Sequence, residues 1–195
     1  TDMYGACAIL AHIGDEVIGQ LRFYPRAVCD LLEAGGLCLL QDFPAGPTAD
    51  LVDHDFPSLD KMSDKTLIIH CCMIAPSQKA ENPYLRKGIG SAMVKFLIQW
   101  AADNGWDRLE VDAFEDLPII YEITGSAGHT FWEKLGFSIV SRHAHPHLQG
   151  RDEFVLKLEQ QARDLGIATD AAKERIIMRL DVRPAHESGA RANRS

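Results

Sequence analysis

The stretch from Thr66 to Asn104 constrains the fold most, because it predicts a strand, a loop and a helix in that order. Residues 66–74 (TLIIHCCMI) are almost wholly apolar and rich in residues that favour strands, as expected of a strand covered on both faces. From Ile89 to Asn104 the apolar residues recur with the period of a helix, and Gly105 follows, where glycine commonly ends one. This unit predicts an α/β protein.

The loop between this strand and helix is basic and rich in glycine. It contains Lys79, Arg86 and Lys87, followed by Gly88 and Gly90. Glycines let backbone N–H groups approach a ligand closely, and the positive end of the helix dipole favours an anion there. The sequence therefore predicts a site for a phosphate group.

Two familiar phosphate loops do not fit. A nucleoside triphosphate loop ends in Gly-Lys-Ser or Gly-Lys-Thr, whereas Gly90 is followed by Ser91 and Ala92. A dinucleotide loop needs a third glycine, and Met93 occupies that position.

The stretch instead resembles the acyl-CoA loop of the GNAT N-acetyltransferase superfamily. That loop has the pattern [QR]xxGx[GA] and follows a strand that ends in V-x-P. The corresponding strand end here is Ile74, Ala75 and Pro76, and the loop pattern falls on Leu85, Arg86, Lys87, Gly88, Ile89 and Gly90. Leu85 departs from the Gln or Arg of the pattern, and Arg86 beside it supplies a positive charge.

A second segment extends the resemblance. Residues 131–140, FWEKLGFSIV, resemble the family's last helix and strand, usually written FYEKxGF. The resemblance covers roughly residues 5–142 and, less clearly, 173–183. The resemblance implies a GNAT-like α/β (α+β) fold, with a mixed, mostly antiparallel central sheet flanked by helices.

The resemblance also implies a donor, acetyl-CoA, and the residues that hold it. Its diphosphate would lie on the turn made by Leu85, Arg86, Lys87, Gly88, Ile89, Gly90 and Ser91. Its pantetheine arm would lie between two neighbouring strands, bonded to the backbone of Cys72, Met73 and Ile74. Ser126, at or near the place of a family Asn, would either bond the cofactor or only cap the next helix.

The proton-transfer groups of the family are replaced in this chain. The usual acid, the Tyr of FYEK, is Trp132 here, so the acid would be water, Tyr84 or Tyr121, or none would be needed. The Glu that serves as base in histone-type members falls on Ile68.

Three residues remain as candidates for the base. His70 follows Ile68 on the same strand face, and histidine titrates near pH 6.5. Asp112 and Glu110 lie on the strand predicted over 106–114, which would neighbour the strand over 66–74. A core role for His70 is the alternative. A nucleophilic Cys71 or Cys72 has no base that the sequence places beside it, so direct transfer in a ternary complex is the expected mechanism.

The rest of the chain fits a single domain, 1–183. Residues 5–24 predict an antiparallel hairpin with a turn at Gly14-Asp15-Glu16. Residues 26–65 form an insertion with a possible strand at 37–40, which is expected to shape the acceptor pocket or to be a surface excursion.

Towards the C-terminus, a short helix ending at Leu135 and a strand over 137–142 are expected. An extra helix follows within 149–166, with a strand over 153–158 as the alternative. The final strand spans 174–182, and the tail 184–195 is expected to be disordered. The family's first strand and two helices have no room before Thr1, which predicts a shortened member or a groove completed by another segment or subunit, and so a possible homodimer.

Composition limits the partners. The net charge of −8 argues against nucleic acid, and an acidic surface would attract a cationic amine. No segment predicts a signal peptide or a membrane span, so a cytoplasmic location without a membrane partner is expected. The five cysteines are odd in number and lack a CxxC pair, which predicts reduced, buried thiols. The histidines at 143, 145 and 147 are expected in an exposed loop, and no metal site is predicted.

These observations predict an acyl-CoA-dependent N-acyltransferase, with acetyl-CoA as donor and a small amine or amino group as acceptor. Loss of the Tyr acid and of the family's first strand and two helices favours a noncatalytic acyl-CoA-binding or assembly module as the alternative. A third reading is an α/β protein that does not bind CoA.

Overall fold

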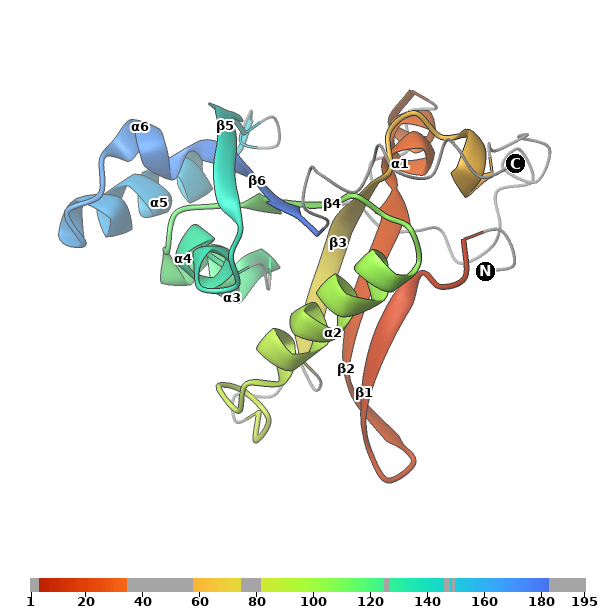
Figure 1. Ribbon diagram of the computed structural model, residues 1–195. Helices are drawn as coiled ribbons and strands as arrows, with labels where there is room; N and C mark the ends of the chain where they lie inside the picture. Colours follow the sequence, from red (N-terminus) through yellow and green to blue (C-terminus); the bar gives the residue numbers. More distant parts are fainter. Residues whose placement is uncertain are drawn as a thin grey trace, which may run out of the picture.

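Six strands form one sheet in the order β1-β2-β3-β4-β6-β5 (Figure 1). The computed structural model describes residues 4–34, 58–74, 82–124, 127–145, 148 and 150–182. The strands are β1 (Ala8–Ile13), β2 (Glu16–Pro25), β3 (Thr66–Ile74), β4 (Arg108–Ala113), β5 (Ser138–Ala144) and β6 (Glu174–Asp181). Of the five pairings, only β3 with β4 is parallel. The predicted mixed, mostly antiparallel sheet is therefore confirmed.

Six α-helices and one short 3-10 helix accompany the sheet in the described part of the chain. They are α1 (Arg26–Ala34), η2 (Leu59–Lys61), α2 (Ile89–Asp103), α3 (Pro118–Thr124), α4 (His129–Glu133), α5 (Asp152–Asp164) and α6 (Thr169–Ala172). The predicted strand over 66–74, the long helix from Ile89 and the N-terminal hairpin are all present. The segment 153–158 is helical within α5, so the alternative strand there is wrong.

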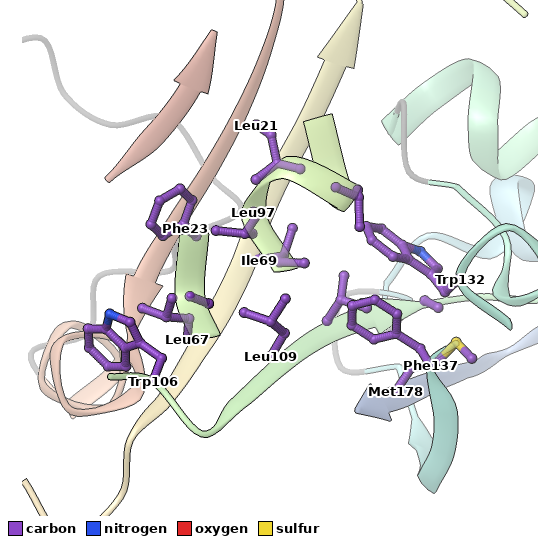
Figure 2. Close-up of a cluster of buried hydrophobic side chains, with 14 of the residues drawn as sticks. Leu21, Phe23, Leu67, Ile69, Leu97, Trp106, Leu109, Trp132, Phe137 and Met178 are labelled. Atoms are coloured by element: carbon purple, nitrogen blue, oxygen red, sulfur yellow. The ribbon is translucent and has the colours of Figure 1, made fainter. Parts of the chain in front are cut away.

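The main core lies between the sheet and α2. Leu67 and Ile69 of β3 and Leu109 of β4 pack with Leu97 of α2 in this core (Figure 2). Val111 of β4 belongs to the same cluster. Trp132 of α4 and Met178 of β6 belong to the same cluster, so α2 and α4 cover one face of the sheet. We call this the inner face, and the opposite one the outer face.

The outer face carries polar side chains on β4 and β6. In β4, Glu110 and Asp112 alternate with the core residues Leu109 and Val111. In β6, Arg179 bonds Glu110 from the same side. Helix α1 contacts β2 and β3, and Arg26 at its start reaches Glu110 as well.

A second, smaller apolar cluster joins α3, α5 and α6. Phe114, which follows β4, packs there with Leu117, Ile120 and Leu158. Residues between β5 and β6 thus form a helical extension of the sheet, on the left in Figure 1. The prediction of an extra helix in this region is confirmed.

Several local predictions need correction. Helix α1 occupies the start of the insertion, where no helix was expected, and α3 forms where no element was predicted. His143 lies in strand β5 rather than in a loop, and His145 follows it and contacts Phe114, with ring centroids 5.2 Å apart. The possible strand at 37–40, His147 and the tail lie outside the described residues.

The cysteines also differ from expectation in part. Cys29 is buried as predicted, but Cys7 is exposed, and Cys71 and Cys72 are partly buried. All four are free thiols, and Cys38 lies outside the described residues. Across the described ranges, no helix has the length and apolar character that a bilayer crossing requires.

Candidate functional site

The parallel strands β3 and β4 part before they end. Their pairing runs from Thr66 opposite Arg108 to Ile69 opposite Val111 and then stops. β3 continues to Ile74 and β4 continues to Ala113, but these last residues of the two strands do not pair with each other. We call the place just after Ile69 and Val111 the branch point. Beyond it, β3 has a paired neighbour only on the β2 side, so some of its backbone groups face the gap.

A β-bulge coincides with the branch point. Arg22 of β2 pairs with Cys71, whereas the next residue, Phe23, pairs with Ile69. His70 is therefore the extra residue of a bulge, a feature that bends a strand and is common beside functional sites. Ile69 and Cys72 both pack on the inner face, which leaves His70 and Cys71, the two residues between them, on the outer face.

The turn before α2 presents its backbone rather than its side chains. Arg86 and Gly88 both have left-handed backbones, with φ of 59° and 79°. Gly88 is the N-cap of α2 and no side chain caps it. The first α-helical bond runs from the N–H of Ala92 to the carbonyl oxygen of Gly88, at 2.9 Å. The N–H groups of Ile89, Gly90 and Ser91 precede it and therefore have no acceptor within the helix.

This turn lies next to the gap between β3 and β4. A Cβ added at Gly90 would be 3.7 Å from Sγ of Cys72 and 3.8 Å from the ring of Phe131 in α4. Asn82 joins the turn to the strand end, because its Nδ2 donates to the carbonyl oxygen of Ile74 at 3.0 Å. Its Oδ1 accepts from the N–H of Tyr84 at 2.9 Å. Helix start, strand end and α4 therefore meet around Gly90.

The residues predicted to hold the cofactor fall into two groups by position. The turn residues Leu85, Arg86 and Lys87 are exposed, and Ile89, Gly90 and Ser91 open α2. Cys72, Met73 and Ile74 form the part of β3 beyond the branch point, where Met73 is exposed. The carbonyl oxygen of Ile74 already accepts from Asn82. Ser126 and Lys79 lie outside the described residues.

Two of the predicted catalytic residues flank the branch point. His70 immediately follows Ile69, and Asp112 immediately follows Val111, so they stand on the two parting strands at the same level. The ring of His70 contacts Tyr24 of β2, with centroids 5.9 Å apart. Asp112 accepts from Nη1 of Arg175 at 3.3 Å. The sequence alone could not place these two residues opposite each other.

Glu110, the third candidate, is bound into a buried ion network. It lies on the outer face and is only 7% exposed. Nη2 of Arg26 is 2.6 Å from Oε1, and Nε and Nη2 of Arg179 are 3.1 and 3.0 Å from Oε2. Both carboxylate oxygens are therefore held by arginines, which leaves Glu110 poorly placed to accept a proton from a substrate.

The structure places Trp132 in the core. It is 3% exposed and its ring packs edge-on against Phe131 and Phe137, at 5.0 and 5.3 Å. Of the two tyrosines considered as replacement acids, Tyr121 is 47% exposed on α3 and Tyr84 lies in the turn before α2. Tyr84 is thus the one that belongs to the turn.

Cys72 is a poor nucleophile in this environment. Burial, with a smaller contribution from the neighbouring Cys71, raises the pKa of the Cys72 thiol to about 12. A thiol is nucleophilic as its thiolate, so Cys72 is unreactive near neutral pH. Its role beside Gly90 is therefore packing.

Sequence reasoning missed a polar cluster at the end of β4. Glu115 accepts from Nη1 of Arg142 at 2.7 Å, and Arg142 also lies 3.4 Å from Glu174. Nδ1 of His129, at the start of α4, is 3.7 Å from Glu115 and 3.5 Å from Asp116. The cluster ties α4 to β4, β5 and β6. Its members are far apart in sequence, so no local signal could have found it.

No metal ligand cluster is present in the described part of the chain: no three His, Cys, Asp or Glu side chains there are grouped to hold an ion.

Among known proteins, this chain resembles solved structures, whereas its sequence finds no match. No protein-family model matches the sequence, and no curated protein matches it. The solved structures that resemble this chain include GNAT-family acetyltransferases.

Three of these GNAT-like structures illustrate the range. The ribosomal-protein-S18-alanine N-acetyltransferase from Escherichia coli is 13% identical, with a TM-score of 0.47, over 93% of this chain and 72% of that one. A GNAT family acetyltransferase from Elizabethkingia anophelis with acetyl-CoA bound is 14% identical, with a TM-score of 0.45, over 89% and 74%. A GNAT-like decarboxylase in complex with isobutyryl-CoA is 12% identical, with a TM-score of 0.48, over 91% and 78%.

Proposed function

We propose that this protein is an acyl-CoA-dependent N-acyltransferase that transfers an acyl group, acetyl in the simplest case, to a small amine. The observation that carries the proposal is the separation of β3 from β4 beside the uncapped start of α2. Where β3 and β4 separate, backbone groups of the strands are left unpaired, and the start of α2 adds unpaired N–H groups. An acyl-CoA carries a matching pair of features, an amide-containing arm and a diphosphate.

The turn would hold the diphosphate. The N–H groups from Gly88 to Ser91 lie at the N-terminus of α2. Left-handed Gly88 is followed by helical Ile89, and such a pair of residues forms a concavity of N–H groups that binds anions. The side chains of Arg86 and Lys87 add positive charge from the solvent side. This arrangement needs no particular side chain at position 85, which explains how Leu85 is compatible with the role.

The pantetheine arm would lie against β3 beyond the branch point. Amide groups of the arm can bond to strand backbone much as an added strand does. Cys72, Met73 and Ile74 would supply that backbone, whereas their side chains would matter less. The thioester would then lie near His70 and Asp112.

In the reaction, the amine lone pair attacks the thioester carbonyl, so a C–N bond forms and the C–S bond then breaks. His70 or Asp112, directly or through water, would take the proton that the amine nitrogen loses. Backbone N–H groups of β3 that face the gap are the available oxyanion donors. The leaving thiolate takes up a proton from water or Tyr84, so Trp132 need not act as the acid.

A noncatalytic acyl-CoA-binding module is the second candidate. The burial of Trp132 favours it, because the helix that carries the acid in the resembled family presents no proton donor to the gap here. The two functions share the cofactor site and differ only in turnover.

Calorimetric titration with acetyl-CoA, followed by an amine panel monitored through release of free thiol, tests both. The transferase predicts heat of binding and thiol release that depends on the amine. Binding without release on a broad panel would favour the binding module, and no binding would remove both functions. The double variant Arg86→Glu/Lys87→Glu should weaken acetyl-CoA binding at least tenfold, because each reversed charge repels the diphosphate. Lys157→Glu on α5 is the matched control and should leave the affinity unchanged.

A further inference from the structure

Arg22 lies beside the branch point on the outer face. It pairs with Cys71 across β2 and β3, next to the bulged His70. Its neighbours Leu21 and Phe23 are fully buried on the inner face, so the alternation of the strand points Arg22 to the opposite side. Tyr24, two residues on, contacts the ring of His70. The charge of Arg22 also acts on the Tyr24 hydroxyl, opposing the rise in its pKa that burial causes.

Arg22 differs from the other outer-face arginines in its partners. Arg26 and Arg179 bind Glu110, and Arg175 binds Asp112. Arg22 has no ion pair with any residue that the structure describes. Its Nε is buried and, within the same described ranges, has no hydrogen-bond acceptor.

A buried guanidinium N–H without an acceptor is unfavourable, so a group that brings an acceptor to Nε of Arg22 would be stabilised there. The planar fork of arginine matches carboxylate and phosphate groups, which it binds through two parallel hydrogen bonds. The place where such a group would bind is next to His70, where the proposed reaction takes the proton from the acceptor amine.

We propose that the acceptor is an amine that also carries an anionic group, a carboxylate or a phosphate, and that Arg22 binds this group. This inference rests on the proposed function for the place of the amine, at His70 and Asp112. It makes Arg22 a residue that determines acceptor specificity. It also differs from the expectation drawn from net charge, because the local charge at this position is positive.

Matched compounds test the inference without any variant. Ligand-observed NMR on the full chain would compare α-amino acids with their amides, and O-phosphoethanolamine with ethanolamine. The expected result is binding of the anionic member of at least one pair, about tenfold or more tighter than the neutral member. Equal binding within both pairs, or no binding of any anionic member, would overturn the inference. The phosphate pair and the carboxylate pair separate the two anionic groups.

Variants then assign the preference to Arg22. Arg22→Met keeps the length of the side chain and should abolish the difference within the pair, whereas Arg22→Lys should restore part of it. Lys157→Met, an exposed lysine on α5, is the matched control and should retain the full preference. Circular dichroism and the thermal midpoint report whether each variant is folded. A full preference retained by folded Arg22→Met would overturn the assignment.

Acetyl-CoA calorimetry on Arg22→Met separates this inference from the proposed function. If Arg22 serves only the acceptor, the affinity for acetyl-CoA stays at the wild-type value. Failure of wild-type protein to bind acetyl-CoA would contradict the transferase itself. Normal acetyl-CoA binding, with neutral amines bound as well as anionic ones, would contradict only the role of Arg22.

Discussion

Ile69 and Val111 form the last backbone pair between the two parallel strands, and the next residue along β3, His70, is the extra residue of a bulge. The two irregularities occur at one level of the sheet. A bulge increases local twist, so it helps to turn the rest of β3 away from β4. The result is a gap whose rim carries His70 and Asp112 and whose inner side adjoins Gly90.

Gly90 can be tested by adding volume in two steps. Gly90→Ala should be tolerated, because its Cβ would meet Cys72 and Phe131 at ordinary contact distances, and it should stabilise α2 by up to about 1 kcal/mol. Gly90→Leu would fill the space between β3 and α4 and should reduce acetyl-CoA affinity at least tenfold. Thermal unfolding and calorimetry measure the two effects. Equal affinity in Gly90→Leu would show that the cofactor does not approach this position.

His70→Gln tests the base. If His70 accepts the amine proton, kcat/KM of the wild type should fall at acidic pH as the imidazole becomes protonated. In the variant, kcat/KM at neutral pH should be about a hundredfold lower than in the wild type, and it should no longer fall at acidic pH. His12→Gln, an exposed histidine on β1, serves as the control. A variant whose pH profile matches that of the wild type would leave Asp112 as the base.

The network around Glu110 predicts a stability effect. Glu110→Gln removes the charge that Arg26 and Arg179 share, and it should destabilise the fold by about 2 kcal/mol, less than for a fully buried pair because both arginines are partly exposed. Arg163→Gln removes an exposed pair on α5 and should change stability by less than about 0.5 kcal/mol. Urea titration measures both values. Similar losses in the two variants would mean that Glu110 is not structurally important.

The four described thiols should differ in reactivity. Cys7 is exposed and should react first with iodoacetamide, whereas Cys72 should react last because burial raises its pKa to about 12 from an ordinary value of 9.0. The same shift affects stability. It favours the folded state fully below pH 9, and this contribution is lost as the pH rises towards 12. Mass spectrometry of labelled peptides would show the order, and early labelling of Cys72 in folded protein would contradict the burial.

Much of the fold was predictable because the strand Thr66–Ile74 and the helix from Ile89 carry strong periodic patterns and clear end signals. The bulge was not predictable, since the residues around His70 are apolar on both sides and alternation cannot reveal an inserted residue. The burial of Glu110 was also hidden, because its partners Arg26 and Arg179 come from distant elements. Helix α3 is only seven residues long, so residues 118–124 make too few turns to show a helical period.

The loop motif was enough to predict candidate cofactor residues, whereas no motif pointed to a candidate residue for the acceptor. Nothing local marks Arg22 as different from the other arginines. Only the strand register shows that it adjoins the bulge, and only the hydrogen-bond partners show that its Nε lacks an acceptor among the described residues.

The most direct test of the cofactor site is a map of backbone amide shifts in the 15N-labelled protein as CoA is added. Perturbations should concentrate at the amides of Gly88 to Ser91 and of Cys71 to Ile74, since these groups would bond the diphosphate and the pantetheine arm. Shifts confined to other parts of the chain, or none at saturating CoA, would contradict a binding site between the parted strands.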